Sequence, residues 1–469
     1  MRTINEYILK RATVVYFLSL LVCVILYSSH WMAWYWTLAG IIEVTAFYLL
    51  SSYLEKSWWR REQVSFERSI FFLSLSIRLL WLIGFYLFTT NVWHTPWEQP
   101  PGTPLDSESY FNEALWLKEL FLNKDITPYL IYISGRIDDT GYPVFLGFLD
   151  LLSNNSIFFT RLPNILFDAW TAVLTYRIAN RSFGERIARR SAIFVVLMPM
   201  IIFYSGTTMK ESLMLMLSTW AIERGDYTIR NRSFIGLSFF GFILLSSSLL
   251  FFRTALAWVV FLSFISALVF SSKRVITKSR RVLISVIIII VGFTMGGAIM
   301  NQSEQLSEQM ESTGANFEYR ASKQGGNVLV KNLSKAMLAP LIFTIPFPTM
   351  VSIEGQNIQM LQNGGFFIKN ILSFFVIFAF IVILKRKAWG NSVMIIAYLV
   401  GYLIVLTLSS FAHSGRFHHP ILPVEMIFAS LGMSFINNKR QVSWFDLFLF
   451  LEFIVIIAWN GFKLKGRGF

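Results

Sequence analysis

Long runs of apolar residues recur along this 469-residue chain, with short polar or basic segments between them. About 20 apolar residues in a helix cross the ~30 Å hydrocarbon core of a bilayer. We therefore expect an all-α, polytopic integral membrane protein with about thirteen transmembrane helices. The expected spans are 12–28, 31–54, 69–91, 157–176, 188–206, 208–223, 233–250, 254–272, 281–300, 366–385, 389–411, 417–436 and 444–462.

Two other apolar segments do not fit a simple span. Residues 142–153 are too short, and 328–351 is broken by Pro340, Pro346 and Pro348. We expect both to be re-entrant or interfacial pieces, which survive at membrane depth only when protein covers them. The chain has no repeat of fixed period, so residues 1–469 are interpreted as a single integral membrane domain.

Composition and charge placement support this class. Hydrophobic residues make up 55% of the chain, and the net charge is +14. The basic residues cluster between the expected spans, as in 56–68, 177–190 and 273–281. By the positive-inside rule these segments face the cytoplasm, where they can also contact anionic membrane lipids. The positive charge thus reflects topology and does not indicate a nucleic-acid partner.

The only cysteine, Cys23, lies inside the first expected span, which excludes an internal disulfide and a CxxC zinc site. That first apolar run lacks a small-residue cleavage site, so we expect a retained span and no removed signal peptide.

Alternation of the spans places 92–156 and 301–365 on the outer face, together with short turns near 207, near 253 and at 412–416. Polar residues that are unusual for such a chain gather in these segments. The stretch 106–142 is acidic, and Tyr110, Ala114, Leu117 and Phe121 recur at helical spacing within it. This spacing predicts an amphipathic helix lying in the membrane interface.

Carboxylates in this loop are candidates for a general base, which takes a proton from an acceptor hydroxyl. The D-x-E pattern of Asp106 and Glu108 is expected to place two carboxylates close together, and Asp138 and Asp139 are alternative bases or metal ligands. The alternative interpretation is that these side chains only solvate a loop.

Cations on the same face suit a phosphate group. Lys210, Arg253 and Arg416 are the candidates, and an arginine can bind phosphate with two parallel hydrogen bonds. We expect them to act on a bound phosphate and not on folding. Lys210 and Glu211 are equally well explained as an ordinary pair at the start of a helix.

A metal site is not predicted. His413 and His418 lie near His419, but adjacent histidines cannot share a helix face, and no fixed carboxylate accompanies them. We therefore expect no cofactor, with a divalent metal at the phosphate as the alternative.

Four ionisable residues fall within the expected spans: Glu43, Arg78, Asp168 and Glu425. Ionisable groups at membrane depth are functional candidates by default, although Arg78 could instead snorkel or make a structural pair.

Several segments, in this order, resemble the GT-C glycosyltransferases, and more narrowly the bacterial members related to protein mannosyltransferases and aminoarabinose transferases. They are D-x-x-x-Y (Asp106, Tyr110), GYPVFLGFLDLL, RLPNILFDAWTAVLTYRIANRSFG, LMPMIIFYSGTTMKESLM and GRFHHPILPVEMIFASLGM. The resemblance covers roughly 69–225 and 401–436. It implies a polyprenyl-phosphate-linked sugar donor, inverting transfer at the outer face of the bacterial cytoplasmic membrane, and a loop carboxylate as base, which maps onto Asp106.

The expected function is thus transfer of a sugar to a lipid or glycan acceptor. One alternative is a polymerase or ligase of lipid-linked oligosaccharides, which often uses a long outer loop such as 301–365. We expect this loop to be a mobile lid that orders when the donor binds and shields the reacting centre from water. The same loop is equally well explained as a passive connection. An alternative of another class is a lipid or oligosaccharide flippase or transporter. Transport predicts polar residues in both halves of the bilayer and internal repeats, and the sequence shows neither.

Overall fold

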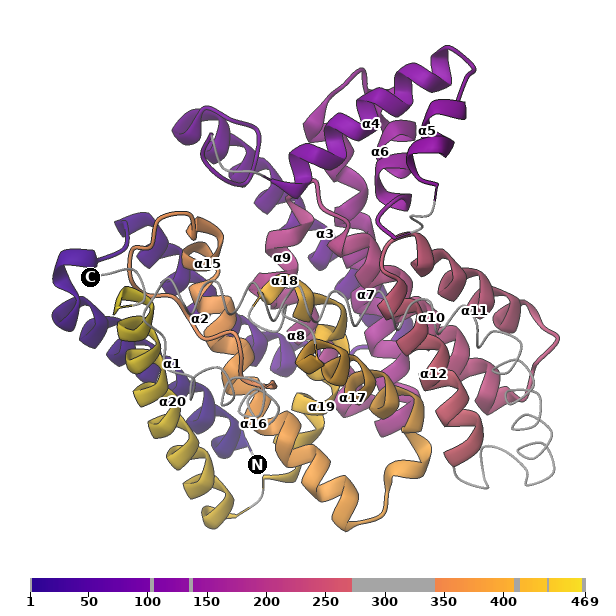
Figure 1. Cartoon of the computed structure of the whole chain (residues 1–469). Helices are drawn as coiled ribbons and strands as arrows, with labels where there is room; N and C mark the ends of the chain where they lie inside the picture. Colours follow the sequence, from indigo (N-terminus) through magenta and orange to yellow (C-terminus); the bar gives the residue numbers. More distant parts are fainter. Residues whose placement is uncertain are drawn as a thin grey trace.

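The computed structural model describes residues 2–101, 105–134, 138–271, 342–408, 414–436 and 438–465. Within these ranges the chain is helical, and the one β-bridge is an isolated pairing of Trp31 with Val351. Figure 1 shows how these helices of different lengths pack against one another.

The first half of the chain contains α1 (Arg2–Leu26), α2 (Trp34–Ser57), α3 (Gln63–Phe88), α4 (Asp106–Leu122), α5 (Thr127–Tyr132), α6 (Gly141–Ser153), α7 (Ile157–Phe183), α8 (Glu185–Leu197), α9 (Pro199–Ser205) and α10 (Glu211–Asn231). The second half contains α11 (Leu237–Ser248), α12 (Thr254–Phe270), α15 (Asn357–Leu361), α16 (Asn363–Lys385), α17 (Val393–Leu408), α18 (Gly415–His418), α19 (Leu422–Phe435) and α20 (Lys439–Lys465).

Each expected span coincides with helix except 281–300, which lies outside the described residues. Among the described helices, four are long and apolar enough to cross a membrane: α2, α3 with its π-helical extension to Trp93, α16 and α20. The bent pair α8 and α9 would be a fifth. Large apolar side chains on the outer surfaces of α2, α3 and α20 are exposed, including Leu49, Leu80 and Phe450. An apolar surface of this kind is typical of a membrane-facing protein.

Two expected spans are not continuous helices. The helix predicted over 188–206 bends by 51° between α8 and α9. Pro199 begins α9, and a residue before proline, here Met198, is pushed out of the helical conformation. The span predicted over 417–436 is divided into α18, a 3₁₀ turn and α19, because Pro420 and Pro423 interrupt the helical hydrogen bonds.

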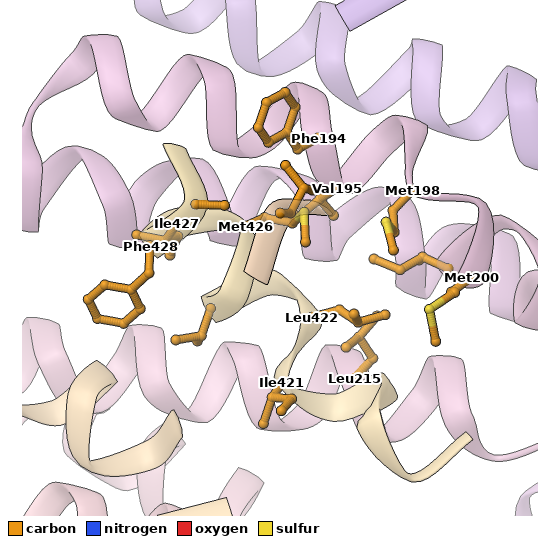
Figure 2. Packing of buried hydrophobic residues seen from close by; sticks show 14 of the residues in the cluster. Phe194, Val195, Met198, Met200, Leu215, Ile421, Leu422, Met426, Ile427 and Phe428 are labelled. Carbon is orange, nitrogen blue, oxygen red and sulfur yellow. The ribbon is translucent and has the colours of Figure 1, made fainter. Parts of the chain in front are cut away.

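The core lies where α7, α8, α10, α16 and α19 meet. Figure 2 shows Phe194, Val195 and Met198, from the α8–α9 region, near Met426 and Ile427 of α19. Helix α19 also packs closely on α16: a Cβ at Gly432 would lie 1.9 Å from the Phe375 carbonyl oxygen. Glycine allows this approach of the two backbones, and it fixes how α19 and the preceding α18 are held.

Helices α4, α5 and α6 form a separate layer at the top of Figure 1. As predicted, α4 is amphipathic, and its apolar face buries Ala114 and Leu117. This face packs on α6, where Phe121 stacks on Phe148 with ring centroids 5.0 Å apart, and the interfacial location stays a prediction. Protein, and not lipid, therefore covers the apolar side of α4. The short segment 142–153 is α6, with 13 residues.

The ionisable residues at depth are paired with polar groups. Arg78 donates to the carbonyl oxygens of Val195 and Val196, and its Nε lies 3.8 Å from Asp168. Asp168 accepts a hydrogen bond from Ser212 at 2.9 Å. These contacts join α3, α7, α8 and α10, which supports the structural interpretation of Arg78.

A second set of buried ionisable groups lies along α16. Glu43 accepts a hydrogen bond from the Gly365 amide at 2.9 Å, and Glu452 accepts one from Asn370 at 3.0 Å. Lys369 donates to two backbone carbonyls and lies within electrostatic reach of Glu425. Buried polarity is therefore less confined to one face than the sequence suggested.

The loop 301–365 is described only from residue 342. Residues 344–351 are buried, and the carbonyl oxygen of Ile345 accepts a hydrogen bond from Lys369 of α16 at 2.8 Å. The amide of Met350 donates to Asn460 of α20 at 2.8 Å. This part of the Pro-broken segment is covered by protein. The expected lid at 301–327 lies outside the described residues.

Candidate functional site

Charged residues from four distant segments meet where helices begin. Asp106 is the first residue of α4, Glu211 is the first residue of α10, Arg253 directly precedes α12, and Arg416 lies in α18. A carboxylate in the first turn of a helix is stabilised by the unpaired backbone N–H groups there. With Lys210, which directly precedes Glu211, we call this group the Arg416 cluster.

Arg416 connects two carboxylates. Its Nε donates to Glu211, and its Nη1 donates to Asp106. The Glu211 side chain is fully buried, whereas 60% of the Asp106 side chain is exposed. One arm of the guanidinium is thus fixed inside the protein, and the other meets a carboxylate that water can reach.

Arg253 supports the same centre from the other side. Its Nη2 lies 4.0 Å from Glu211, and its Nη1 donates to the Tyr402 hydroxyl at 3.2 Å. The guanidinium carbon is 4.5 Å from the centre of the Phe417 ring, a distance suited to a cation–π contact. Because Phe417 follows Arg416, this contact also helps to position Arg416.

Lys210 has a more enclosed environment. Its Nζ donates to the Phe252 carbonyl at 2.8 Å, pairs with Asp139, and lies 5.8 Å from the Tyr110 ring centre. Burial, assisted by the positive charge of Arg253, lowers the pKa of Lys210 to about 7. The contact with the Asp139 carboxylate acts in the opposite direction and favours the ammonium form. These two influences predict different protonation near neutral pH.

Asp138 has a structural partner. Its carboxylate accepts a hydrogen bond from the Thr254 backbone amide at 2.9 Å, which satisfies an unpaired N–H group in the first turn of α12. Together, Asp138 and the neighbouring Asp139 attach the loop before α6 to α12 and to Lys210.

A cavity of about 200 Å³ borders the cluster, and we call it the Arg416 cavity. Asp106 and Arg416 line it, whereas Lys210, Arg253 and Glu211 do not. The uncharged polar residues in its wall are Gln99, Tyr204, Gln359, Gln362 and Ser414. The sequence interpretation missed these five, because they come from four segments and carry no motif.

Glu108 does not join the cluster. It is exposed on α4, and residues two apart in a helix point to opposite sides, so the expected proximity of the two carboxylates in D-x-E is wrong.

Tyr110 is half-buried against Tyr142, with ring centroids 5.5 Å apart. Burial raises the pKa of Tyr110 to about 12, so its hydroxyl stays protonated at neutral pH.

The histidines do not make a metal centre in the described part of the chain. His418 is fully buried, and His413 lies outside the described residues. In the ranges that the structure describes, no group of three or more His, Cys, Asp or Glu side chains is arranged to hold a metal ion.

Another missed feature fixes the loop before α4. Glu98 is fully buried and accepts a hydrogen bond from the hydroxyl of Ser107, the neighbour of Asp106. Arg161 of α7 donates to the Pro96 carbonyl at 2.7 Å and to Thr208 at 2.9 Å. Burial raises the pKa of Glu98, and the positive charge of Arg161 opposes this rise. These contacts hold the start of α4 against α7.

Comparison with known proteins gives no match to a protein-family model, a curated protein or a solved structure. The resemblance to the GT-C glycosyltransferases stays a prediction from the order of the sequence motifs.

Proposed function

We propose that this chain is a membrane glycosyltransferase of the GT-C type, which moves a sugar from a polyprenyl phosphate to a lipid or glycan acceptor. The observation that carries the proposal is the pairing of Asp106 with Arg416 at the wall of a cavity. Transfer from a lipid phosphate needs a base for the acceptor hydroxyl and a positive charge for the departing phosphate. These two residues provide both within one contact.

The helices support a place in the bacterial cytoplasmic membrane with the site on the outer face. Arg177 and Arg181 lie at the end of α7, and Arg189 and Arg190 lie near the start of α8. The Arg416 cluster is at the opposite end of α10 from Arg230. If basic segments face the cytoplasm, the cluster faces outward. We propose a topology of about thirteen spans, in which the shorter apolar helices α11, α12 and α17 cross the membrane beside the long ones.

In the proposed reaction, the oxygen of the acceptor hydroxyl attacks the anomeric carbon of the donor sugar. The Asp106 carboxylate takes the proton of this hydroxyl at the same time. The bond between this carbon and the phosphate oxygen breaks, and its electron pair leaves with the polyprenyl phosphate. Attack opposite the leaving group inverts the anomeric configuration. Arg416 stabilises the charge that develops on the phosphate.

The exposure of the two carboxylates suggests how Asp106 becomes available. In the free protein the Asp106 carboxylate accepts a hydrogen bond from Arg416, and this contact keeps it from an acceptor hydroxyl. A phosphate can take the place of the exposed Asp106 on Arg416, while the buried Glu211 stays bound to the other side of the guanidinium. Donor binding would thus release Asp106 for proton transfer, and the free enzyme would hold its base in an ion pair.

Arg253 and Lys210 have supporting roles in this proposal. They do not line the Arg416 cavity, so they act through Glu211 and Phe417 and through the local positive field. The volume of the cavity is below the roughly 300–1,000 Å³ that drug-sized ligands occupy. It suits one sugar residue better than an oligosaccharide, which favours single-sugar transfer over the polymerase or ligase alternative.

The test is transfer by the purified full-length chain in lipid nanodiscs, with polyprenyl-phosphate-linked hexoses as donors and membrane lipid extract as acceptor. Asp106→Asn keeps the size of the side chain but cannot accept the proton, so we expect turnover to fall by about 10²- to 10⁴-fold. Glu108→Gln is the matched control, since it neutralises an exposed carboxylate two residues away, on the other side of the same helix. Equal activity of wild type and Asp106→Asn would exclude Asp106 as the base.

A further inference from the structure

Gln362 stands out among the residues that line the Arg416 cavity. Its side chain is fully buried, yet neither the amide oxygen nor the amide nitrogen has a hydrogen-bond partner among the described residues. The Tyr204 hydroxyl, also in the cavity wall, lies within electrostatic reach of this amide without good hydrogen-bond geometry. Buried amides are normally satisfied, so an unpaired one beside a cavity points to a ligand.

The amide defines the chemistry of that ligand. A glutamine presents both a donor and an acceptor, and a hydroxyl group can satisfy either one. Apart from Asp106 and Arg416, the other polar residues that line the cavity are also uncharged, among them Gln99, Gln359 and Ser414. Apolar side chains such as Phe366 complete the lining, which therefore suits a neutral ring with hydroxyls at its edge and apolar faces.

We infer that Gln362 binds a hydroxyl of the donor sugar and thereby determines which sugar is accepted, an inference that rests on the proposed function. Asp106 and Arg416, the charged lining residues, would lie at the anomeric and phosphate end of the donor. Gln362 would contact the ring away from that end. The inferred ligand is a single neutral hexose or acetamido-hexose attached to a lipid phosphate.

The N-terminal helices hold Gln362 in place. The residue directly precedes α16, and its neighbour Asn363 accepts a hydrogen bond from Tyr16 of α1 at 2.6 Å and donates to the Trp36 carbonyl of α2 at 3.2 Å. Glu43 of α2 binds the Gly365 amide at 2.9 Å. These contacts preorganise the start of α16, which lowers the cost of ordering the binding residue. They also give a role to two spans that precede the acidic loop.

Binding measurements can separate recognition of the sugar from recognition of the phosphate. Farnesyl phosphate and farnesyl phosphates carrying glucose, galactose, mannose or N-acetylglucosamine would be titrated into the full-length protein in nanodiscs. We expect wild type to bind one sugar-bearing probe more tightly than farnesyl phosphate. Gln362→Met should remove about 10- to 100-fold of that preference and leave the affinity for farnesyl phosphate unchanged.

Two further variants keep the test decisive. Gln63→Met is the matched control and should bind like wild type, because Gln63 is an exposed amide at the start of α3 that donates to Glu67 in the same helix. If Gln362→Met fails to fold, Gln362→Asn retains the amide but shortens its reach, and it should lose the same preference. A preference that survives in both Gln362 variants would overturn the inference and leave the proposed function intact. The inference also fails if wild type binds no sugar-bearing probe better than farnesyl phosphate. The proposed function is tested separately, by the transfer assay with Asp106→Asn.

Discussion

Arginine–carboxylate pairs occur at both ends of the helices around α10, but they differ in what surrounds them. At the end that we call the basic end, Arg177 pairs with Glu67 at 2.7 Å, Arg181 with Glu223 at 2.8 Å, Arg190 with Glu55, and Arg230 with Asp226 at 2.9 Å. Three of these pairs join two helices, α7 with α3, α7 with α10, and α8 with α2, and the fourth lies within α10. In the Arg416 cluster, one guanidinium is shared by two carboxylates, one buried and one exposed, beside a cavity.

The comparison shows that the surroundings, and not the type of residue, indicate function here. A buried or half-buried pair that joins two helices stabilises their packing, and replacing it should change stability. A pair with one exposed member at a cavity can exchange partners with a ligand. The same charged residues therefore serve assembly at one end and, in our proposal, chemistry at the other.

The largest effect that would sharpen this comparison is expected from Arg416→Ala. Transition-state stabilisation of the phosphate is lost, which should lower turnover by about 10²- to 10³-fold. The variant leaves the buried Glu211 with Arg253, 4.0 Å away, as its remaining ion-pair contact, so we expect a loss of about 3 kcal/mol in the free energy of unfolding, near the lower end for a broken buried pair. The expected loss of stability differs from the expectation from sequence that the cations act on phosphate and not on folding.

A double variant separates the two roles of Arg416. In Arg416→Ala/Glu211→Gln the buried charge is gone, so denaturant unfolding should show stability partly restored while turnover stays low. Recovery of turnover together with stability would mean that Arg416 is a structural residue like those at the basic end.

At the basic end, Glu55→Gln should have the opposite profile. Arg190 has only 3% of its side chain exposed and loses a charged partner, although the new amide can still accept a hydrogen bond. We expect the free energy of unfolding to fall by about 1 kcal/mol. Turnover per folded molecule should equal that of wild type. A loss of turnover at full folding would show that this end also contributes to the reaction.

Prediction from sequence worked where the signal is local. Apolar runs predicted the helices, and the spacing of Tyr110, Ala114 and Leu117 predicted the amphipathic α4, since helical periodicity is a property of neighbouring residues. The breaks at Pro199 and Pro420 were visible in the sequence but were not used. The members of the Arg416 cluster all lie in or beside the acidic loop and the outer-face turns, where the sequence placed the candidate site.

The parts that failed depend on long-range contacts. Nothing near Glu211 in the sequence indicates that it shares a guanidinium with Asp106, because Arg416 follows 205 residues later. Gln362 has no distinguishing neighbours either, and its interest comes from burial without a partner. Glu108 was assigned with Asp106 because the two are close in sequence, whereas the helix turns them apart.

The smallest expected effect concerns Lys210. It tests whether this residue of the Arg416 cluster is charged or neutral in the folded protein. If its folded-state pKa is about 7, below the ordinary 10.5, the unfolded chain binds more protons between these values. Stability should then rise with pH from 7 toward 10.5, and the part due to Lys210 is absent in Lys210→Met. We expect the stability of wild type, relative to Lys210→Met, to increase between pH 7 and pH 9. The increase should be smaller than the limit of about 1.4 kcal/mol per pH unit, because Asp139 favours the ammonium form. Denaturant unfolding at both pH values measures it, and a difference that does not change with pH would show that Asp139 keeps Lys210 fully charged, as a closed ion pair of the kind found at the basic end.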